Sequence, residues 1–258
     1  MSAPRDLPDL TGHVVLVTGA GGGVGGGIVT RFALAGAAVV AHYRTGREAA
    51  LERVERIRAD GGDALALSAD LTDEAECGRL VAEAAAWRGR LTALVNNAGV
   101  QPTRPLADLA ADEWRHVVDT NLTSAFACTQ AAVPLMAGAG GGSVTHIASI
   151  EGSRPAREHA HYSASKAALI MHARSAALEY GALGVRVNTV SPGLIDRPGL
   201  DTAWPEGVGR WQAAAPLRRL GTSEDVGDAC VFLASPMARW VTGHDLVVDG
   251  GVSCAPTW

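Results

Sequence analysis

The sequence predicts a doubly wound α/β fold, in which helices flank both faces of a mostly parallel, seven-stranded sheet within a single domain. Three observations predict it. Short β-like runs alternate with helix-length segments along the chain. Several of these runs are almost continuously apolar, as expected for parallel strands that are covered on both faces. The length of 258 residues and the 47% content of hydrophobic residues suit one large domain with a substantial core.

The predicted strands, with their exits, succeed one another along most of the chain. They lie at 13–19 ("HVVLVTG"), 37–43, 63–70, 91–99, 143–149, 185–193 and 245–251. Helix-length segments lie between them, among them 73–88 and 162–182. Right-handed crossovers bring the carboxyl ends of parallel strands to one edge of the sheet, and we expect a ligand crevice there.

Residues 194–216 interrupt this alternation. The segment contains Pro198, Pro205 and Pro216, together with Trp204 and Trp211. It leaves the sheet at the expected ligand edge, where long excursions are commonly lids or binding loops. We therefore predict a substrate lid over 194–216, inside one domain that spans residues 1–258. An ordinary surface insertion is the alternative.

Charge and composition restrict the partners. A net charge of −5 argues against nucleic acid, which requires a concentrated basic face. No apolar run approaches the length of a membrane span and the N-terminus lacks an apolar signal core, so we expect a cytoplasmic protein. The four cysteines are widely spaced without a C-x-x-C pair, which fits reduced thiols and suggests no metal site.

A glycine-rich turn, "GAGGGVGGG" at 19–27, follows the first predicted strand. Glycines let backbone N–H groups approach a pyrophosphate closely, and a helix N-terminus adds a favourable dipole. Alone the run is a weak signal, because glycine-rich segments match G-x-G-x-x-G in some register by chance. The strand before it and the apolar segment after it favour a dinucleotide site over a flexible turn.

The end of the second strand indicates which dinucleotide is bound. An NAD site usually places Asp or Glu there, whereas the 2′-phosphate of NADP attracts arginine. This chain has Tyr43 and Arg44 and no acid, which predicts NADP(H). NAD(H) is the alternative cofactor, and Arg44 would then be an ordinary surface arginine. Asp70 ends the third strand, placed either to bind the adenine amino group or to cap the helical segment from Thr72.

The chemistry is predicted at "HYSASK", residues 161–166. Tyr162 and Lys166 are four residues apart and share one helix face, and Lys166 is the only lysine in a chain rich in arginine. A nearby ammonium favours the phenolate and should lower the pKa of the tyrosine toward neutrality. Ser149 ends the preceding strand at the same edge. Each residue alone has a structural explanation, but their combination with the glycine-rich turn favours catalysis.

These motifs, in this order, resemble the short-chain dehydrogenase/reductase family over about residues 10–252. The matching pieces are the T-G-x-x-x-G-x-G motif from Thr18, "NNAG" at 96–99, "TNLTS" around Asn121, Ser149, Y-x-x-x-K at 162–166, "SPG" at 191–193 and "TGHDLVVDGG" at 242–251. The resemblance implies a Rossmann-like fold and a catalytic tetrad. Tyr162 would exchange the proton, Ser149 would hold the substrate oxygen, Lys166 would bind the ribose, and Asn121 would hold a water linking Lys166 to bulk.

The resemblance also implies the ligand contacts. Cofactor contacts are expected at Thr18, Gly19, Gly23, Val24, Gly25, Arg44, Asp70, Leu71, Asn97, Ala98, Gly99, Tyr162, Lys166, Pro192, Gly193 and Ile195. Substrate contacts are expected at Gln101, Glu151, Trp204 and Trp211. The tryptophans favour an apolar or aromatic ketone unless they only pack the lid, whereas Glu151, Arg154, His159 and His161 favour a polar substrate.

Two positions depart from the family pattern. Gly22 stands where NADP-preferring relatives often carry a basic residue, so that the 2′-phosphate would depend largely on Arg44. Arg197 stands where relatives often carry a threonine that binds the carboxamide. This arginine could reach the cofactor phosphates, or it could leave the lid differently anchored.

The sequence thus predicts an NADP(H)-dependent oxidoreductase acting on a small ketone or secondary alcohol, favouring carbonyl reduction. An NAD-dependent alcohol dehydrogenase and a non-catalytic dinucleotide-binding scaffold are the alternatives, the scaffold disfavoured because no tetrad member is missing. An enoyl reductase is disfavoured, because the branch of the family with that activity has a longer spacing between tyrosine and lysine than the four residues found here. The resemblance also suggests a homotetramer or homodimer, paired through the helices around 112–137 and 160–182.

Overall fold

The carboxyl ends of parallel strands meet at one edge in this protein, as the alternation predicts. The computed structural model describes residues 7–254, and within them a seven-stranded sheet has the order β3-β2-β1-β4-β5-β6-β7, with every pairing parallel. The strands are β1 (Val14–Val17), β2 (Ala38–Tyr43), β3 (Ala64–Ser68), β4 (Ala93–Asn96), β5 (Gly142–Ile147), β6 (Val185–Pro192) and β7 (Asp245–Val248). The order reverses between β1 and β4, a change of direction that opens a crevice in sheets of this kind.

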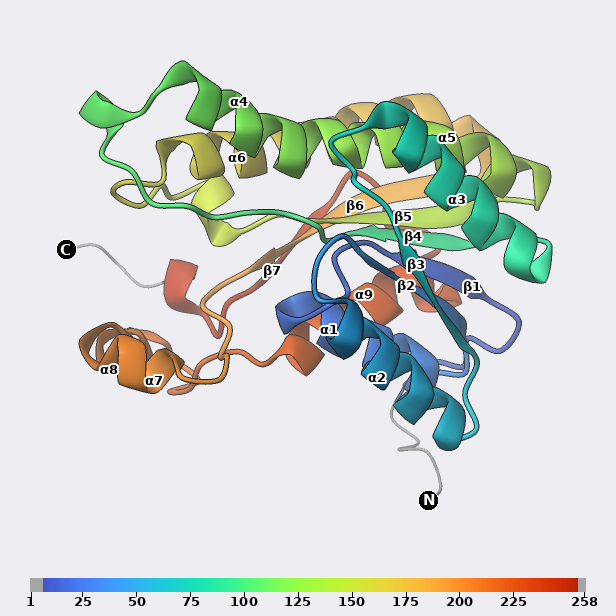
Figure 1. The fold of residues 1–258 in the computed structure, drawn as a ribbon, viewed down its shortest axis with the longest axis horizontal. Helices are drawn as coiled ribbons and strands as arrows, with labels where there is room; N and C mark the ends of the chain where they lie inside the picture. Colours follow the sequence, from blue (N-terminus) through green and yellow to red (C-terminus); the bar gives the residue numbers. More distant parts are fainter. Residues whose placement is uncertain (1–6, 255–258) are drawn as a thin grey trace.

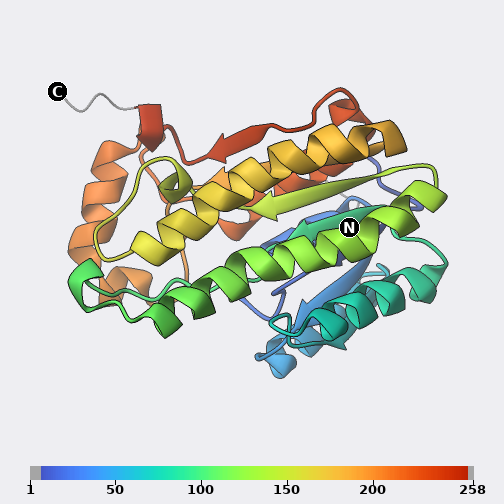
Figure 2. The ribbon, with the colours of Figure 1, turned by 90° about the horizontal axis from the view of Figure 1, so that it is seen from above.

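Helices cover both faces of the sheet, because most strands are apolar on both sides (Figure 1). The first face carries α1 (Gly23–Leu34), α2 (Arg47–Ala59) and α9 (Ser223–Ala234); the second carries α3 (Glu74–Arg88), α4 (Ala111–Val118), α5 (Ser124–Gly138) and α6 (Ala160–Tyr180). Within β1, Val15 and Val17 join the core of the first face while Leu16 joins that of the second. Figure 2 shows α5 and α6 running lengthwise over the second face.

Two predicted helices are confirmed with small changes at their ends. The segment expected at 73–88 is α3, which begins after Asp73 because that side chain accepts a hydrogen bond from Ala75 N at 2.9 Å. The segment expected at 162–182 is α6, Ala160–Tyr180, so Tyr162 lies in its first turn. Between α4 and α5 the chain makes a π-helical turn, η2 (Asp119–Thr123), a form that often marks functional sites.

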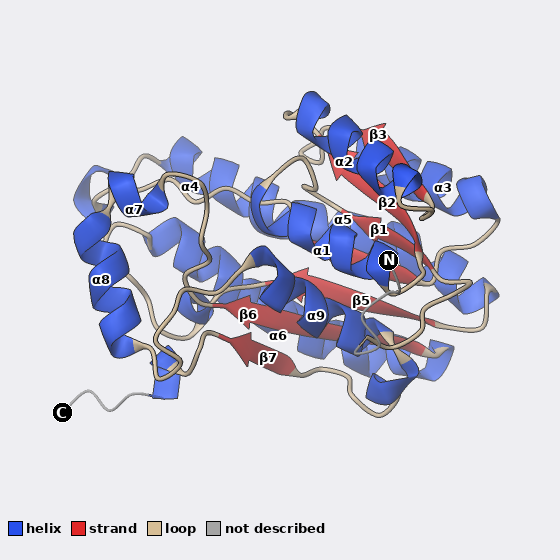
Figure 3. Cartoon of the chain, turned by 90° about the horizontal axis from the view of Figure 1, so that it is seen from below, coloured by secondary structure: helices blue, strands red, loops and turns tan. Residues whose placement is uncertain are grey.

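The segment predicted as a lid forms two short helices, α7 (Leu200–Ala203) and α8 (Pro205–Ala214). They lie beyond the carboxyl ends of β6 and β7 (Figure 3). Leu200, Val208 and Leu220 form a small apolar core of their own there, with Leu194 and Trp211 packed against it. The segment is therefore a small, separately packed group of helices at the ligand edge of the sheet.

Between residues 7 and 254 no helix is both long and apolar enough to cross a bilayer. In the same range no group of three His, Cys, Asp or Glu side chains converges as a metal centre would require. Cys77, Cys128 and Cys230 are buried thiols and Cys254 is exposed.

Candidate active site

A large cleft, of about 1310 Å³, follows the carboxyl edge of the sheet. Its lining includes every predicted cofactor residue except Thr18, all four predicted substrate residues, and Ser149. Asn121 does not line the cleft. The segments that meet there come from the ends of β1 to β6, so the topology brings together residues 19–25, 43–46, 70–72, 97–101, 147–151 and 192–197.

The glycine-rich turn leaves open space where a dinucleotide would need it. A Cβ atom at Gly22 or Gly23 would have no heavy atom within 4 Å. Gly19 and Gly25 are glycine for another reason, because a Cβ would lie 2.8 Å from Ala98 Cα in the first case and 2.3 Å from Gly19 O in the second. The turn thus packs tightly on the sheet while presenting bare backbone to the cleft, an arrangement that fits a pyrophosphate.

Thr18, predicted to contact the cofactor, lies behind this turn and does not line the cleft. Its side chain is 1% exposed, and its Oγ1 accepts hydrogen bonds from the backbone N–H groups of Asn97 and Ala98, each at 3.0 Å. Asn97 Nδ2 in turn donates to the carbonyl oxygens of Thr18 and Gly19, at 2.9 and 3.0 Å. Thr18 therefore joins the ends of β1 and β4 and positions the turn.

His42 is a residue of the cleft that the sequence analysis missed. Gly19 N donates to its Nδ1 at 3.0 Å, so Nε2 carries the ring proton and donates to Ala69 O at 3.1 Å. Burial lowers the pKa of His42, which keeps the ring neutral. The imidazole therefore holds the glycine-rich turn and the end of β3 in register. A lone histidine in an apolar strand gives no sequence signal for this role.

Arg44 and Asp70 lie together at the end of the cleft formed by β2 and β3. Arg44 Nη1 is 3.7 Å from Asp70 Oδ1, and both side chains are about half exposed, at 45% and 50%. Thr72 donates to Asp70 Oδ1 from its hydroxyl at 2.7 Å and its N–H at 3.0 Å, which lowers the pKa of that carboxyl. The capping alternative for Asp70 is wrong, because Asp73 is the N-cap of α3.

Lys166 is buried beneath the cleft floor. Its Nζ donates to Ile147 O at 2.7 Å and lies 5.5 Å from the centre of the Tyr162 ring. Burial lowers the pKa of Lys166 to about 8, because desolvation penalises the charged form. A compact ammonium on an unbranched stem suits this buried position better than the broad guanidinium of arginine, which agrees with the single lysine of the sequence.

The pKa of Tyr162 differs from the predicted direction. Burial raises it to about 12, the nearby Glu151 carboxylate raises it further, and a hydrogen bond with the Ser149 side chain opposes both. Lys166 lies on the ring side of Tyr162 and is itself desolvated, so its ammonium does not offset these effects. The sequence predicts a lowered pKa from the lysine alone, and the burial of the Tyr162 side chain, which only the fold reveals, reverses that direction.

Ser149 and Asn121 each make hydrogen bonds near the carboxyl end of a central strand, Ser149 after β5 and Asn121 after β4. Ser149 Oγ accepts a hydrogen bond from Glu151 N at 3.1 Å at the end of β5. Asn121, in the π-helical turn, donates from Nδ2 to Val100 O at 2.9 Å and to Ser165 Oγ at 3.1 Å, and its Oδ1 accepts from Val100 N at 2.8 Å. The Asn121 side chain thus fixes the exit of β4 behind the cleft.

The substrate end combines a polar wall with an apolar lid. Gln101, Glu151, Arg154, Arg157 and His159 line the polar side, whereas His161 is buried outside the lining. Opposite them lie Leu194, Leu200, Trp204 and Trp211. The tryptophans also pack the lid, since a Cβ at Gly193 would lie 2.7 Å from Trp211 and one at Gly207 would lie 1.9 Å from Trp204. Trp204 and Trp211 therefore both line the cleft and pack the lid.

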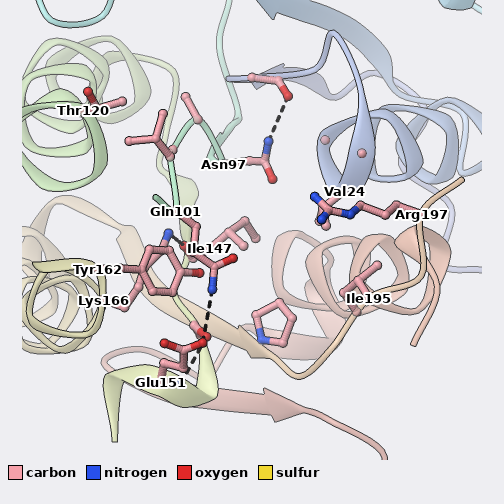
Figure 4. Close-up of a pocket in the computed structure, with 18 of the residues that line it drawn as sticks. Val24, Asn97, Gln101, Thr120, Ile147, Glu151, Tyr162, Lys166, Ile195 and Arg197 are labelled. Carbon is pink, nitrogen blue, oxygen red and sulfur yellow. Dashed lines mark hydrogen bonds between the residues drawn. The ribbon is translucent and has the colours of Figure 1, made fainter. Parts of the chain in front are cut away.

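Arg197 lines the cleft between its two ends. Figure 4 shows its guanidinium group extending from the loop of Ile195 toward Val24 in the glycine-rich turn. The same view shows the Tyr162 hydroxyl, the Gln101 amide and the Glu151 carboxylate pointing into a shared part of the cleft. Gly22, the other departure from the family pattern, also lines the cleft and leaves its cationic side to Arg44 and Arg197.

Comparison with known proteins supports the resemblance. A family model described as enoyl-(acyl carrier protein) reductase matches residues 19–253. The chain is 37% identical over 244 residues to the 2,5-dichloro-2,5-cyclohexadiene-1,4-diol dehydrogenase LinX of Sphingobium indicum, covering 95% of this chain and 97% of the relative.

Two solved structures are similar throughout. The first is 7α-hydroxysteroid dehydrogenase with NADH and 7-oxo glycochenodeoxycholic acid, with a TM-score of 0.90, 36% identity and coverage of 94% of this chain and 95% of that one. The second, assigned as an NAD(P)-dependent gluconate 5-dehydrogenase of Beutenbergia cavernae and holding NADP at low occupancy, has a TM-score of 0.90, 36% identity and coverage of 96% and 99%. With its fold, its ordered motifs and these relatives, the chain belongs to the short-chain dehydrogenase/reductase family of oxidoreductases.

Proposed function

We propose that this protein is an NADP(H)-dependent oxidoreductase that interconverts a ketone and a secondary alcohol and favours carbonyl reduction in the cell. The observation that carries the proposal is the convergence of Tyr162, Ser149 and Lys166 on one cleft that also contains the bare glycine-rich turn. A non-catalytic scaffold would not need a buried lysine beneath a buried tyrosine at the edge of such a cleft.

The residues divide the work as their positions suggest. The nicotinamide cofactor, when bound, gives or takes a hydride at its C4 atom. Tyr162 donates a proton to the substrate oxygen during reduction, which suits a phenol with a pKa of about 12 because it remains protonated at neutral pH. Ser149 holds the substrate oxygen, and Lys166 binds the cofactor ribose through its ammonium group. Asn121 keeps the exit of β4 fixed, and its water-holding role remains a prediction.

The preference for NADP(H) rests on Arg44. Members of the family have been solved with NADH and with NADP, so family membership alone does not choose between them. Arg44 supplies a half-exposed guanidinium where β2 ends, and the contact of 3.7 Å to Asp70 is loose enough for a 2′-phosphate to compete for it. Asp70 is then placed toward the adenine amino group. An NAD-dependent alcohol dehydrogenase is the second candidate.

Arg197 and the lid complete the proposal. The Arg197 guanidinium points toward the glycine-rich turn, where a pyrophosphate would lie, so we assign it to the cofactor phosphates. Residues 194–216 then act as a lid that a bound cofactor fastens to the body of the domain. We place the protein in the cytoplasm as a homotetramer or homodimer, and light scattering tests the assembly.

The Tyr162→Phe variant tests the catalytic assignment. Removing the phenolic hydroxyl should lower ketone reduction by at least about 100-fold, because proton transfer by a positioned acid contributes that much or more. The measurement is NADPH or NADH oxidation over a panel of ketones, with an enoyl thioester included because of the description of the family model. Binding of NADPH, followed by its fluorescence, should persist in the variant.

Two outcomes would contradict the proposal. Turnover of Tyr162→Phe within a few-fold of the wild type would remove Tyr162 from the chemistry. Reduction of the enoyl thioester in preference to every ketone would replace carbonyl reduction by double-bond reduction. The spacing of four residues between Tyr162 and Lys166 predicts the opposite result.

A further inference from the structure

Glu151 is held at the substrate end of the cleft by three donors. Its Oε1 accepts from Gln101 Nε2 at 3.1 Å, and its Oε2 accepts from His159 Nδ1 at 2.9 Å and from Ser163 Oγ at 3.3 Å. The Glu151 side chain is only 17% exposed, as is that of His159. A carboxylate offers about four lone-pair sites, so these donors fix its position and leave about one site for a ligand.

These bonds determine what the neighbouring groups present to the cleft. Because the amide nitrogen of Gln101 donates to Glu151, the free end of that amide is its carbonyl oxygen. Because Nδ1 of His159 donates to Glu151, the tautomer with its proton on Nδ1 has an unshared pair on Nε2. Gln101, Glu151 and His159 therefore form an acceptor wall. The N–H groups of Gln101 and His159 are used on Glu151, and the atoms left free on the three side chains accept hydrogen bonds.

The acceptor wall lies next to the reacting position. Glu151 N donates to the Ser149 hydroxyl at 3.1 Å, and the His159 ring packs edge-on against the Tyr162 ring with 6.0 Å between centroids. Figure 4 shows Gln101 and Glu151 on the hydroxyl side of Tyr162. A substrate whose oxygen contacts Tyr162 and Ser149 would meet the wall with atoms only a bond or two away.

The acceptor wall favours substrate groups that donate a hydrogen bond over groups that only accept one. A second carbonyl or an ether offers only acceptors and would leave the wall unpaired, and a carboxylate would be repelled by Glu151. An ammonium would pair with Glu151 but would meet Arg154 and Arg157, which line the same end. A neutral hydroxyl donates without either penalty.

Resting on the proposed function, we propose that the acceptor wall selects substrates with a hydroxyl on the carbon adjacent to the reacting one, so that the enzyme interconverts vicinal diols and α-hydroxyketones. In the oxidative direction the reacting carbinol loses its C–H hydrogen as hydride to the oxidised nicotinamide. Its O–H proton passes to Tyr162, which must first have released its own phenolic proton to solvent. The neighbouring hydroxyl is unchanged and only donates a hydrogen bond to the wall.

The test compares matched substrates on the full-length protein. We expect kcat/KM for 2-hydroxycyclohexanone to exceed that for cyclohexanone by about 100-fold, since sites built to bind a hydroxyl discriminate strongly against analogues that lack it. The same order should hold for trans-1,2-cyclohexanediol over cyclohexanol. Glu151→Gln should reduce the ratio at least about tenfold, because an amide retains one acceptor and turns a donor toward Gln101 or His159.

Two further variants sharpen the result. Glu48→Gln removes an exposed carboxylate on α2, outside the acceptor wall, and should keep the wild-type ratio. Gln101→Leu changes an exposed side chain, so it tests the wall even if the position 151 variant fails to fold, and it should also lower the ratio. Glu151→Asp, which keeps the carboxylate, should recover part of the preference.

The failures of the two proposals are distinguishable. Turnover of ketones without a hydroxyl preference, or a preference that survives both Glu151→Gln and Gln101→Leu, would overturn the acceptor wall and leave the proposed function standing. A preference for trans-2-aminocyclohexanol over the diol would overturn the assignment to a hydroxyl. No turnover of any carbonyl with either cofactor would instead overturn the proposed function.

Discussion

Arg44 shows how one side chain can decide cofactor choice. Its guanidinium is half exposed and its contact with Asp70 is long, at 3.7 Å, so little protein interaction competes with a phosphate. Exposed ion pairs contribute at most about 1 kcal/mol. A 2′-phosphate carries more charge than a carboxylate and pairs with arginine in a bidentate manner, which gives it the advantage.

The Arg44→Ala variant should therefore weaken NADPH much more than NADH. We expect KM for NADPH to rise about tenfold or more, equivalent to at least about 1.4 kcal/mol, while KM for NADH changes less than about threefold. Steady-state kinetics with both cofactors measures this. Arg47→Ala, at the start of α2, is a matched loss of charge nearby. Equal effects of Arg44→Ala on both cofactors would refute the phosphate role.

At the residue scale, the sequence identified the candidate catalytic residues better than the residues that hold them in position. Tyr162, Lys166 and Ser149 belong to recognisable motifs, and they line one cleft. Thr18 also belongs to a motif, yet it acts from behind the turn because its hydroxyl is occupied by two backbone N–H groups. His42 and the partners of Glu151 were not predictable, since their roles depend on contacts between segments that only the folded sheet brings together.

The glycine-rich helix α1 illustrates packing at the level of elements. A Cβ at Gly27 would lie 2.4 Å from the Ser223 side chain, at the start of α9. The two helices therefore approach closely on the first face of the sheet. The low helix propensity of glycine predicts a weak start for α1, and this close approach to α9 is the compensating gain.

Two alanine substitutions should separate these effects. Gly27→Ala should destabilise the protein by about 1–3 kcal/mol, because the added methyl group overpacks the contact with α9. Gly78→Ala, at a position in α3 where a Cβ meets nothing within 4 Å, should stabilise by about 0.5–1 kcal/mol through helix propensity. Chemical denaturation measures both. A stabilising effect of Gly27→Ala would contradict the close approach of α1 and α9.

The lid offers a second test between elements. If Arg197 fastens residues 194–216 to the cofactor phosphates, Arg197→Ala should raise the dissociation constant for NADPH about tenfold, and the loss should shrink at high salt. Fluorescence titration measures it without any turnover. Arg210→Ala, on the exposed side of α8, is the matched control and should change little. Unchanged affinity in Arg197→Ala would remove Arg197 from the cofactor site.

Element positions were largely predictable, because the alternation of apolar runs and helical segments reflects a sheet covered on both faces. The π-helical turn at Asp119–Thr123 and the two helices of the lid were not. Their shape follows from tertiary contacts, namely the hydrogen bonds of Asn121 with Val100 and the packing of Trp211 over Gly193. Local sequence carries little information about either.

The stability of the whole molecule should depend on pH, because the fold buries histidines in their neutral form. His146 accepts from Asn96 Nδ2 at Nδ1 and donates from Nε2 to His172 Nδ1, each at 3.1 Å, and burial lowers its pKa to about 3. The unfolded chain takes up this proton near pH 6.5, well before the folded one. The free energy of unfolding should therefore fall as pH falls from about 6.5 toward 3.

The slope is measurable by urea denaturation at a series of pH values. Each such histidine contributes up to about 1.4 kcal/mol per pH unit within this window. His146→Gln should make the slope shallower, whatever it does to stability at neutral pH. His116→Gln, an exposed position on α4, should leave the slope unchanged. The same slope in His146→Gln as in the wild type would contradict the burial of a neutral ring.

The order of the strands has a consequence for synthesis of the chain. β1 pairs with β2 on one side and with β4 on the other, so Val15 meets Ala93 only after the fourth strand has left the ribosome. Until then an apolar strand edge is exposed to other nascent chains. We expect production in cells to be limited by aggregation of half-made chains, and slower translation or added chaperones to raise the yield of active enzyme.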